Sequence, residues 1–398
     1  MIFKKIHLVM LCFTGYLAMA GGSLLAPVLP EMVTPLQTTA QAVGLLMSVF
    51  TLSTAIFTLV LSHFIDRLDR KQILVPSLLI YGLTGIAGYY STDFTVLLVM
   101  RFVQGIGVAG MMTLAFLIIG EAYRGVESIS AISRMSMSLA IGAITAPMIG
   151  GTLASMGWNY PFLFFLLSIP FALMVTVLLP ETREQNRNVR HAGISEALSA
   201  LREFPVTYTI FMGFSIFFLL YSLIIYLPFM LKELFDFSSG ESGLMLAIEG
   251  VAVVILASQM RMLSCRFSMI RVIAVGFFLV GISMLCISFT SSITGIFLLL
   301  ILFGAGLGLA QTAIDAQIIQ ISPARSKGGI LSIHTCMKYM GMSLAPIILG
   351  VILSFTGLQT VFIISGILGI AVTIATLLMR GRFDALVIQG SEPTVSAR

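Results

Sequence analysis

Charged side chains are scarce in this chain of 398 residues. Only 10% of the residues are Asp, Glu, Lys or Arg, whereas 58% are hydrophobic, and the mean hydropathy is +1.06. Soluble domains typically carry about 25% charged residues. A water-soluble fold of this composition would lack the polar side chains that cover its surface. The composition therefore excludes an ordinary soluble protein and indicates a protein surrounded by lipid.

Several kinds of catalytic or cofactor site are also missing. The four cysteines, Cys12, Cys265, Cys286 and Cys336, are isolated and show neither metal-ligand nor CxxC spacing, so we expect them to pack in the apolar interior. The sequence has no Gly-x-x-x-x-Gly-Lys-[Ser/Thr] loop, which excludes a nucleotide site of that kind as the energy source. It has no metal or nucleophile constellation either. We therefore expect no enzyme, no cofactor and no metal.

Long apolar segments fill the rest of the chain. A helix needs roughly 20 apolar residues to cross about 30 Å of hydrocarbon. The segments are continuously apolar and do not alternate with period two, which favours helices over a β-barrel. We expect twelve transmembrane helices, at 6–29, 42–64, 73–91, 94–119, 132–156, 161–180, 207–231, 243–262, 272–290, 294–321, 328–355 and 360–379. The fold class is thus an all-α integral membrane protein.

The positions of the basic residues predict the orientation. With a cytoplasmic amino terminus, 19 of the 22 Lys and Arg residues fall on the inner side, and only Lys232 falls in an outer loop. This is the positive-inside bias, and it places both termini in the cytoplasm. The net charge of +5 is therefore a topology signal, and we expect no nucleic-acid partner. Ala18-Met19-Ala20 resembles a signal cleavage site, but the apolar run continues to Leu29, so we expect a retained first helix.

An internal repeat divides the chain into two halves about 200 residues apart. Gly105-Ile-Gly107-Val-Ala109 recurs as Gly306-Leu-Gly308-Leu-Ala310, and Pro147 matches Pro346. Two pseudo-symmetric six-helix bundles in a parallel repeat put a substrate site near the midplane between them. We expect an amino-terminal bundle at 1–180, a cytoplasmic linker at 181–206 that is partly a surface helix, a carboxy-terminal bundle at 207–380 and a cytoplasmic tail at 381–398.

Three motifs extend this reading. A loop carries Ser62-His-Phe-Ile-Asp66-Arg67-Leu-Asp69-Arg70-Lys71, the fourth helix carries Arg101-x-x-x-Gly105-x-x-x-Ala109, and the fifth carries Gly142-x-x-x-Ala146-Pro147-x-x-Gly150-Gly151. Together they resemble the motifs of the major facilitator superfamily, specifically its twelve-helix drug:proton antiporters, and the resemblance covers essentially the whole chain. The chain departs from the family pattern at Ser62, Asp69 and Ala146, where glycine is usual.

The resemblance implies a conformational latch in the loop motif. In the family, the loop Asp meets the start of helix 11 and the last Arg meets an acid at the end of helix 4. Asp66, Arg67 and Arg70 match the family's loop residues, and Glu121 is a suitable acid. An ion pair or a carboxylate at a helix amino terminus can stabilise one conformational state. The alternative is a solvated basic loop without that function.

The helix motifs carry further expectations. Arg101 must face the interior, because a buried arginine costs at least about 2.5 kcal/mol without a partner or water, and the resemblance suggests a role in proton relay. The first helix has no acid in its core to pair with it, only Glu31 at its outer end. The helix 5 motif resembles the signature of exporters. Its small residues permit close helix approach, so a generic packing seam is the alternative.

Three ionisable residues gather on the predicted helices 10 and 11. Asp315 lies six residues before the cytoplasmic end of helix 10, and His334 and Lys338 lie one helical turn apart on helix 11. Asp315 is thus placed to reach His334 or Lys338. We hypothesise that Asp315 and Lys338 form a pair whose protonation or substrate occupancy changes between access states. A static ion pair is the alternative.

Glu249 on helix 8 is the other interior acid. No cation lies within its own helix, and an unpaired buried carboxylate tends to bind a proton rather than remain charged. Glu249 is therefore our first candidate for the exchanging proton site. The alternative is a carboxyl in a water-filled outer vestibule.

These features predict a secondary active transporter in the cell inner membrane. The favoured function is efflux of small amphipathic drugs or metabolites by alternating access, coupled to inward flow of protons. The expected partners are the lipid bilayer, a small-molecule substrate and protons, and the chain is expected to act as a monomer. The alternatives are a dedicated exporter of one siderophore, sugar, nucleoside or amino-acid derivative, a lipid flippase and a non-transporting sensor.

Overall fold

The chain folds as a helical membrane protein. The computed structural model describes residues 3–64, 68–181, 199, 201–323, 326–381 and 383. Twelve helical segments in these ranges are long and apolar enough to cross a membrane, which confirms the predicted count and the all-α class. Of the linker predicted at 181–206, residues 182–198 and 200 lie outside the described residues, and so do residues 382 and 384–398 of the predicted tail.

The first half contains α1 (Lys5–Ser23), η1 (Ala26–Val28), α2 (Leu29–Met32), α3 (Ala40–Val43), α4 (Leu45–Phe64), α5 (Arg70–Tyr90), α6 (Phe94–Ala122), α7 (Gly125–Ala154), η2 (Tyr160–Leu167) and α8 (Ser168–Leu178). The second half contains α10 (Phe204–Phe235), α11 (Ser239–Ser258), α12 (Met260–Arg266), α13 (Met269–Phe289), α14 (Ile293–Ile321), α15 (Lys327–Phe355) and α16 (Leu358–Leu378).

Local chemistry moves two of the predicted boundaries. The predicted first helix, 6–29, is interrupted after Ser23, where Pro27 in η1 cannot donate a backbone hydrogen bond. Conversely, α11 starts four residues before the predicted position, because Ser238 caps it and Glu241 completes a capping box. Glu249 therefore lies ten residues into its helix, about 15 Å along the axis.

Polar contacts tie the helices together within each half. In the first half, the Thr54 hydroxyl donates to the Gly105 carbonyl at 3.2 Å. In the second half, the Tyr208 and Thr376 hydroxyls lie 3.1 Å apart. The outer surface is apolar: Val177 on α8 and Leu378 on α16 are 79% and 80% exposed, as expected of side chains that face lipid. Cys12, Cys286 and Cys336 have intermediate exposure, so they are only partly buried in the apolar interior in which we expected them to pack.

The contacts of the interior glycines correct the register of the repeat. A methyl group at Gly105 would overlap the Phe50 carbonyl, whereas one at Gly304 would overlap the Glu249 carbonyl. Gly107 and Gly306 are related in the same way, since they lie against the carbonyls of Ser77 and Gly276. The two glycine pairs and the two pairs of carbonyls that they contact are each 199 positions apart, as are Pro147 and Pro346. Gly105 thus corresponds to Gly304, not to Gly306 as the sequence comparison suggested.

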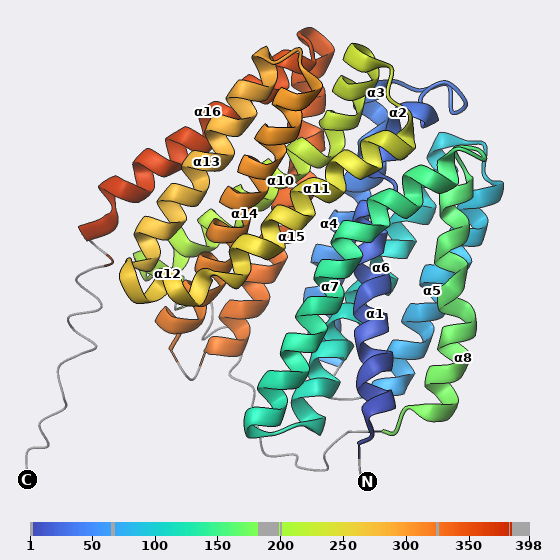
Figure 1. The fold of residues 1–398 in the computed structure, drawn as a ribbon. Coiled ribbons are helices and arrows are strands. Elements are labelled where there is room, and N and C mark those ends of the chain that lie inside the picture. Colours follow the sequence, from blue (N-terminus) through green and yellow to red (C-terminus); the bar gives the residue numbers. More distant parts are fainter. Residues whose placement is uncertain are drawn as a thin grey trace, which may run out of the picture.

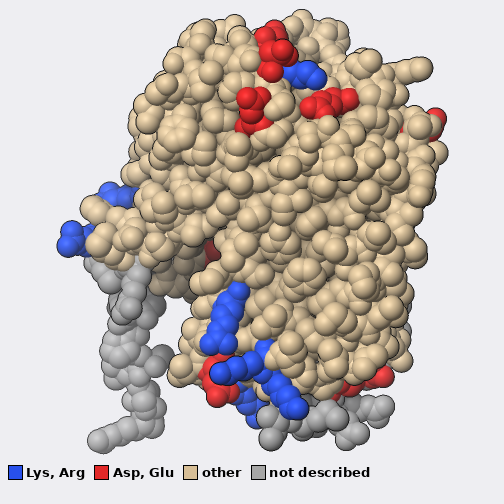
Figure 2. All heavy atoms as spheres, turned by 45° about the vertical axis from the view of Figure 1, so that its right-hand side comes forward, with Lys and Arg blue, Asp and Glu red and all other residues tan. Residues whose placement is uncertain are grey.

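The two halves meet at one end of the molecule and separate at the other. Ser343 donates to the Ser48 carbonyl at 2.9 Å, and the Ser239 amide donates to Glu31 at 3.2 Å. Both contacts lie in the half of the molecule opposite the first residues of α1, and toward those residues the bundles diverge (Figure 1). Figure 2 shows a hollow between the halves on that side, with acidic atoms visible inside it. The structure is therefore closed at one end and open at the other.

Candidate functional site

An ion-pair cluster joins α14 and α15. Lys338 Nζ lies 3.0 Å from Asp315 Oδ1 and 3.1 Å from Oδ2, and His334 Nε2 lies 3.0 Å from Oδ1. The predicted contact of Asp315 with His334 or Lys338 is confirmed, and the carboxylate contacts both. Its side chain is 40% exposed, whereas those of His334 and Lys338 are 4% and 17% exposed. Asp315 thus offers a solvent-accessible carboxylate backed by a cation.

Helix α10 forms the wall behind this cluster. The ammonium of Lys338 lies 4.7 Å from the centre of the Phe217 ring, where the negative face of the ring stabilises the cation. One turn earlier, Gly213 faces His334, and a Cβ there would lie 3.0 Å from Nδ1 and would overlap Cε1. The absence of a side chain at Gly213 therefore makes room for the imidazole. The sequence pattern gave no signal for this role, because a lone glycine in an apolar run resembles any packing glycine.

Glu249 lies apart from this cluster. Its side chain is 6% exposed, and its Oε1 atom has no hydrogen-bond partner in the described part of the chain. The carboxyl of Glu249 is thus largely shielded from solvent in this state. Its helix, α11, packs on α7 of the other half, where Gly250 faces Ile144 and Gly243 faces Pro147. An unpartnered carboxyl therefore lies on a helix that forms the contact between halves.

Arg101 is 1% exposed and its partners are backbone carbonyls, an amide and a ring. Nη2 donates to the Gly21 carbonyl at 3.0 Å and Nη1 donates to Gln104 Oε1 at 2.6 Å, and the guanidinium lies 4.2 Å from the centre of the Phe50 ring. The predicted inward orientation is confirmed. Because α1 is interrupted after Ser23, the Gly21 carbonyl is available to accept from a side chain.

The adjacent carbonyl connects the two halves. Tyr221 on α10 donates its hydroxyl to the Gly22 carbonyl at 3.1 Å. The sequence analysis did not single out Tyr221 as a contact between the halves. Its partner is a main-chain atom exposed by the interruption of α1, which no side-chain pattern reveals. The carbonyls of Gly21 and Gly22 thus accept hydrogen bonds from Arg101 of the same half and from Tyr221 of the other half, respectively.

The loop motif is described only in part. Asp66 and Arg67 lie outside the described residues, so the contact expected between Asp66 and helix 11 has no structural description. Arg70 Nη2 lies 2.5 Å from Glu121 Oε1, and Arg70 Nε donates to the same carboxylate at 3.1 Å. This pair joins α5 to α6 within one half. Glu181, which the sequence analysis did not single out, accepts from the Arg70 amide at 2.8 Å.

The small residues of α7 contact both halves. A methyl group at Gly150 would overlap the carbonyl of Leu24, the residue that follows α1, and one at Gly151 would overlap the Ser239 carbonyl of α11. Gly142 lies against Tyr16, where a Cβ would meet the carbonyl at 3.1 Å. Ala146 and Pro147 are buried in the same segment. The motif thus forms a close-packed contact at the closed end, in addition to packing within its own half.

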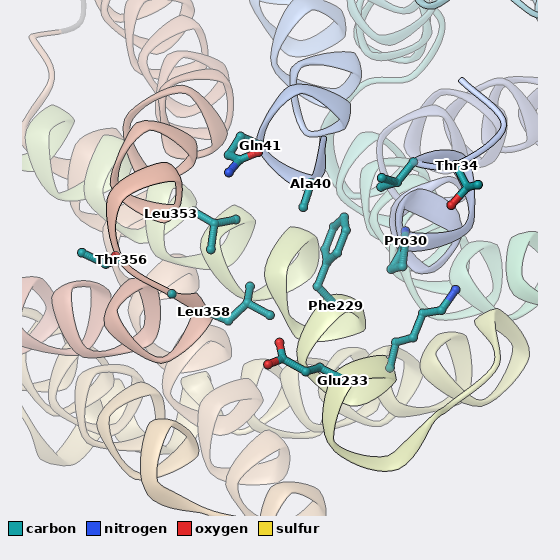
Figure 3. A pocket seen from close by; sticks show the side chains of 12 residues that line it. Pro30, Thr34, Ala40, Gln41, Phe229, Glu233, Leu353, Thr356 and Leu358 are labelled. Carbon is teal, nitrogen blue, oxygen red and sulfur yellow. The ribbon is translucent and has the colours of Figure 1, made fainter. Parts of the chain in front are cut away.

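A pocket of about 540 Å³ lies at the closed end, away from the ionisable residues. Its walls come from both halves: Pro30 and Gln41 belong to the first half, and Phe229, Glu233 and Leu358 belong to the second (Figure 3). It contains none of the predicted site residues. Among the described residues, no three His, Cys, Asp or Glu side chains are grouped as a metal site requires.

Two helical bundles that meet at one end, with ionisable groups buried between their helices, define a membrane transporter. The chain belongs to the Major Facilitator Superfamily, whose family model matches residues 11–264 and 230–393. It is accordingly a multi-pass secondary transporter of small molecules, not an enzyme.

Characterised relatives are distant and include exporters. The chain is 27% identical over 352 residues to the "Bacillibactin exporter" of Bacillus subtilis (strain 168), which covers 84% of this chain and 86% of the relative. It is 25% identical over 361 residues to the "Multidrug efflux protein YfmO" of the same organism, covering 89% and 88%.

Solved structures share the fold. A bacterial homologue of the human lysosomal transporter Spinster, in an inward-facing and unoccupied conformation, matches with a TM-score of 0.77 at 17% identity, covering 94% of this chain and 95% of that one. The nucleoside transporter NupG matches with a TM-score of 0.80 at 13% identity, covering 94% and 99%.

Proposed function

We propose that this transporter exports small amphipathic drugs or metabolites in exchange for protons. The observation that carries the proposal is the unpartnered, buried carboxyl of Glu249 on a helix that joins the two halves. A carboxyl in an apolar environment favours its neutral form, and access of water on either side changes that preference. When the halves rearrange, Glu249 would bind a proton from one side and release it to the other.

The Asp315 and Lys338 pair is the proposed site at which substrate and proton compete. Asp315 has an exposed carboxylate at the open end, in contact with Lys338. A cationic or hydrogen-bond-donating ligand that reaches Asp315 displaces its proton or its contact with Lys338. Export rather than import is favoured by the helix 5 motif and by the exporters among the relatives.

The proposed orientation puts the open end in the cytoplasm of a cell whose inner membrane holds the chain. Figure 2 shows most of the basic groups toward the open end of the molecule and acidic groups gathered at the closed end. This is the distribution that the positive-inside rule gives for cytoplasmic termini. In this orientation the structure is inward-facing, ready to take substrate from the cytoplasm, and a single chain contains both proposed sites.

Proton movement in inside-out vesicles tests the proposal. We expect ethidium, used as an amphipathic probe, to dissipate an imposed proton gradient in vesicles that contain the wild-type chain. Glu249→Gln should abolish this coupled proton movement, and Asp315→Asn should reduce it strongly. Glu233→Gln, at the closed end, is the matched control and should behave as wild type. If Glu249→Gln left ethidium-induced proton movement intact, Glu249 would not be the exchanging site.

A dedicated siderophore-type exporter is the second candidate. It is favoured by the match to the bacillibactin exporter along 84% of this chain. Saturable, proton-dependent uptake of bacillibactin into inside-out vesicles, without any response to ethidium, would support it over broad drug export.

A further inference from the structure

His334 makes a polar contact on only one edge of its ring. Nε2 lies 3.0 Å from Asp315 Oδ1, whereas Nδ1 is buried and has no hydrogen-bond partner in the ranges that the structure describes. The Cε1 corner of the ring faces α10 at Gly213, where a Cβ would overlap Cε1 and lie 3.0 Å from Nδ1. The ring is therefore held between a carboxylate and an apolar helix surface.

This environment selects one form of the imidazole. A proton on Nδ1 would create a buried donor without an acceptor, which costs free energy. A proton on both nitrogens would add a second cation beside Lys338 in a low-dielectric region. A single proton on Nε2 avoids both and gives Asp315 a donor.

We propose that His334 is a positioning residue, a neutral imidazole seated on Gly213 whose Nε2–H holds Asp315 Oδ1 in place. The carboxylate then keeps one orientation toward Lys338, whose Nζ contacts both of its oxygens at 3.0 and 3.1 Å. When a proton or ligand binds the exposed side of Asp315 and loosens its contact with Lys338, His334 keeps the carboxyl from turning away. This role rests on the proposed function, because His334 positions Asp315, the carboxyl at which substrate and proton are proposed to compete.

The first half contains a similar contact without the nitrogen. On α1, Gly15 faces Met135 of α7, and a Cβ at Gly15 would lie 2.8 Å from its Sδ. Met135 and His334 are 199 positions apart, the register of the repeat, whereas Gly15 and Gly213 are 198 apart, so the two glycines differ by one position in that register. A glycine on the facing helix therefore accommodates an apolar side chain in the first half, where Met135 has no carboxylate to position. Packing alone does not require a histidine at position 334.

Nitrogen-15 solid-state NMR of histidine-labelled protein in liposomes tests the proposal without any transport assay. The chain has four histidines, and the signal absent from His334→Gln identifies His334. We expect a neutral ring protonated at Nε2 at neutral pH, with a shifted Nε2 signal in Asp315→Asn. An imidazolium, or a ring protonated at Nδ1, would overturn the proposal even if the chain transports ethidium.

Ethidium-coupled proton movement then separates positioning from packing. His334→Gln keeps an amide donor near the place of Nε2 and should retain activity within about threefold, whereas His334→Leu should lose about tenfold, as expected for a lost hydrogen bond to a charged group. Equal activity of the two variants would contradict positioning. Failure of the wild-type chain to respond would refute only the proposed function, because the NMR result stands independently.

The seat itself provides the second test. Gly213→Ala should reduce activity about tenfold by displacing the ring, and adding His334→Gln in that background should restore it, since a flexible amide avoids the new methyl group. Such coupling between contacting residues is non-additive. Gly328→Ala on α15, where a Cβ would meet no atom within 4 Å, is the control and should be neutral. Additive losses in the double variant would overturn the role of Gly213.

Discussion

The two halves share one backbone plan but place their charges differently. In the first half, Arg101 lies over the ring of Phe50, while the position equivalent to Phe50 in the second half is Glu249. Met135 of the first half packs against Gly15, whereas His334, at the equivalent position of the second half, packs against Gly213. The first half thus has a buried cation fixed by backbone carbonyls, and the second has carboxyls that are exposed or without a partner. Under the proposed function, the first half supports the architecture while the second exchanges protons.

The largest expected effect comes from a pair of equivalent glycines on α7 and α15. A methyl group at Gly151 would overlap the Ser239 carbonyl across the halves, whereas one at Gly350 would lie 3.4 Å from the nearest atom, the Tyr226 hydroxyl. Gly151→Ala should therefore prevent full closure of this end and abolish transport, while Gly350→Ala should be tolerated. Labelling of an engineered cysteine at the closed end by an impermeant maleimide measures closure. Equal labelling of the two variants would contradict the asymmetry.

Arg101→Leu replaces the arginine of the first half by leucine, the residue found at the equivalent position of the second half, Leu300. It leaves two acceptors, the Gly21 carbonyl and Gln104 Oε1, without their donor, a loss of about 1–3 kcal/mol for each buried group left unpaired. We expect a clear fall in the thermal unfolding temperature in detergent. Arg134→Leu, which removes an exposed arginine on α7, is the control. A similar fall in both variants would show that the interior contacts of Arg101 add nothing.

Tyr221→Phe should change the equilibrium between access states with little effect on folding. It removes one hydrogen bond between the halves, about 1 kcal/mol or roughly a fivefold shift toward opening of the closed end. The matched control is Tyr226→Phe, whose lost bond to the Pro346 carbonyl lies within the second half. Distances between spin labels at the closed end measure the shift, and an equal response of the two variants would argue against Tyr221 as a contact that stabilises this state.

The smallest expected effect is that of Met135→Leu. The change conserves volume approximately, and such changes in a core usually cost less than about 1.5 kcal/mol. Ethidium-coupled proton movement should stay near the wild-type rate, in contrast to His334→Leu at the equivalent seat. A loss as large as that of His334→Leu would mean that the seat is sensitive to packing in both halves, and the comparison between halves would fail.

Much of the site followed from the sequence because charged residues are rare in apolar segments. Asp315, His334 and Lys338 were placed together by helix ends and one-turn spacing, and the contacts confirm it. The depth of Glu249 was underestimated because a capping box at Ser238 extends its helix. The register of the repeat was two residues off, because glycine-rich helices match themselves in more than one alignment.

Twelve membrane crossings in two related halves can be predicted from the amino-acid sequence alone, because each helix that crosses hydrocarbon needs a long apolar segment, and such segments are visible in the sequence. The carbonyls, glycines and rings that surround each interior charge are known only from the folded structure. Arg101 and Tyr221 contact main-chain atoms of α1, and His334 lies on the backbone at Gly213. Such contacts depend on how helices pack across distances of up to 200 residues, and no local pattern of side chains encodes them.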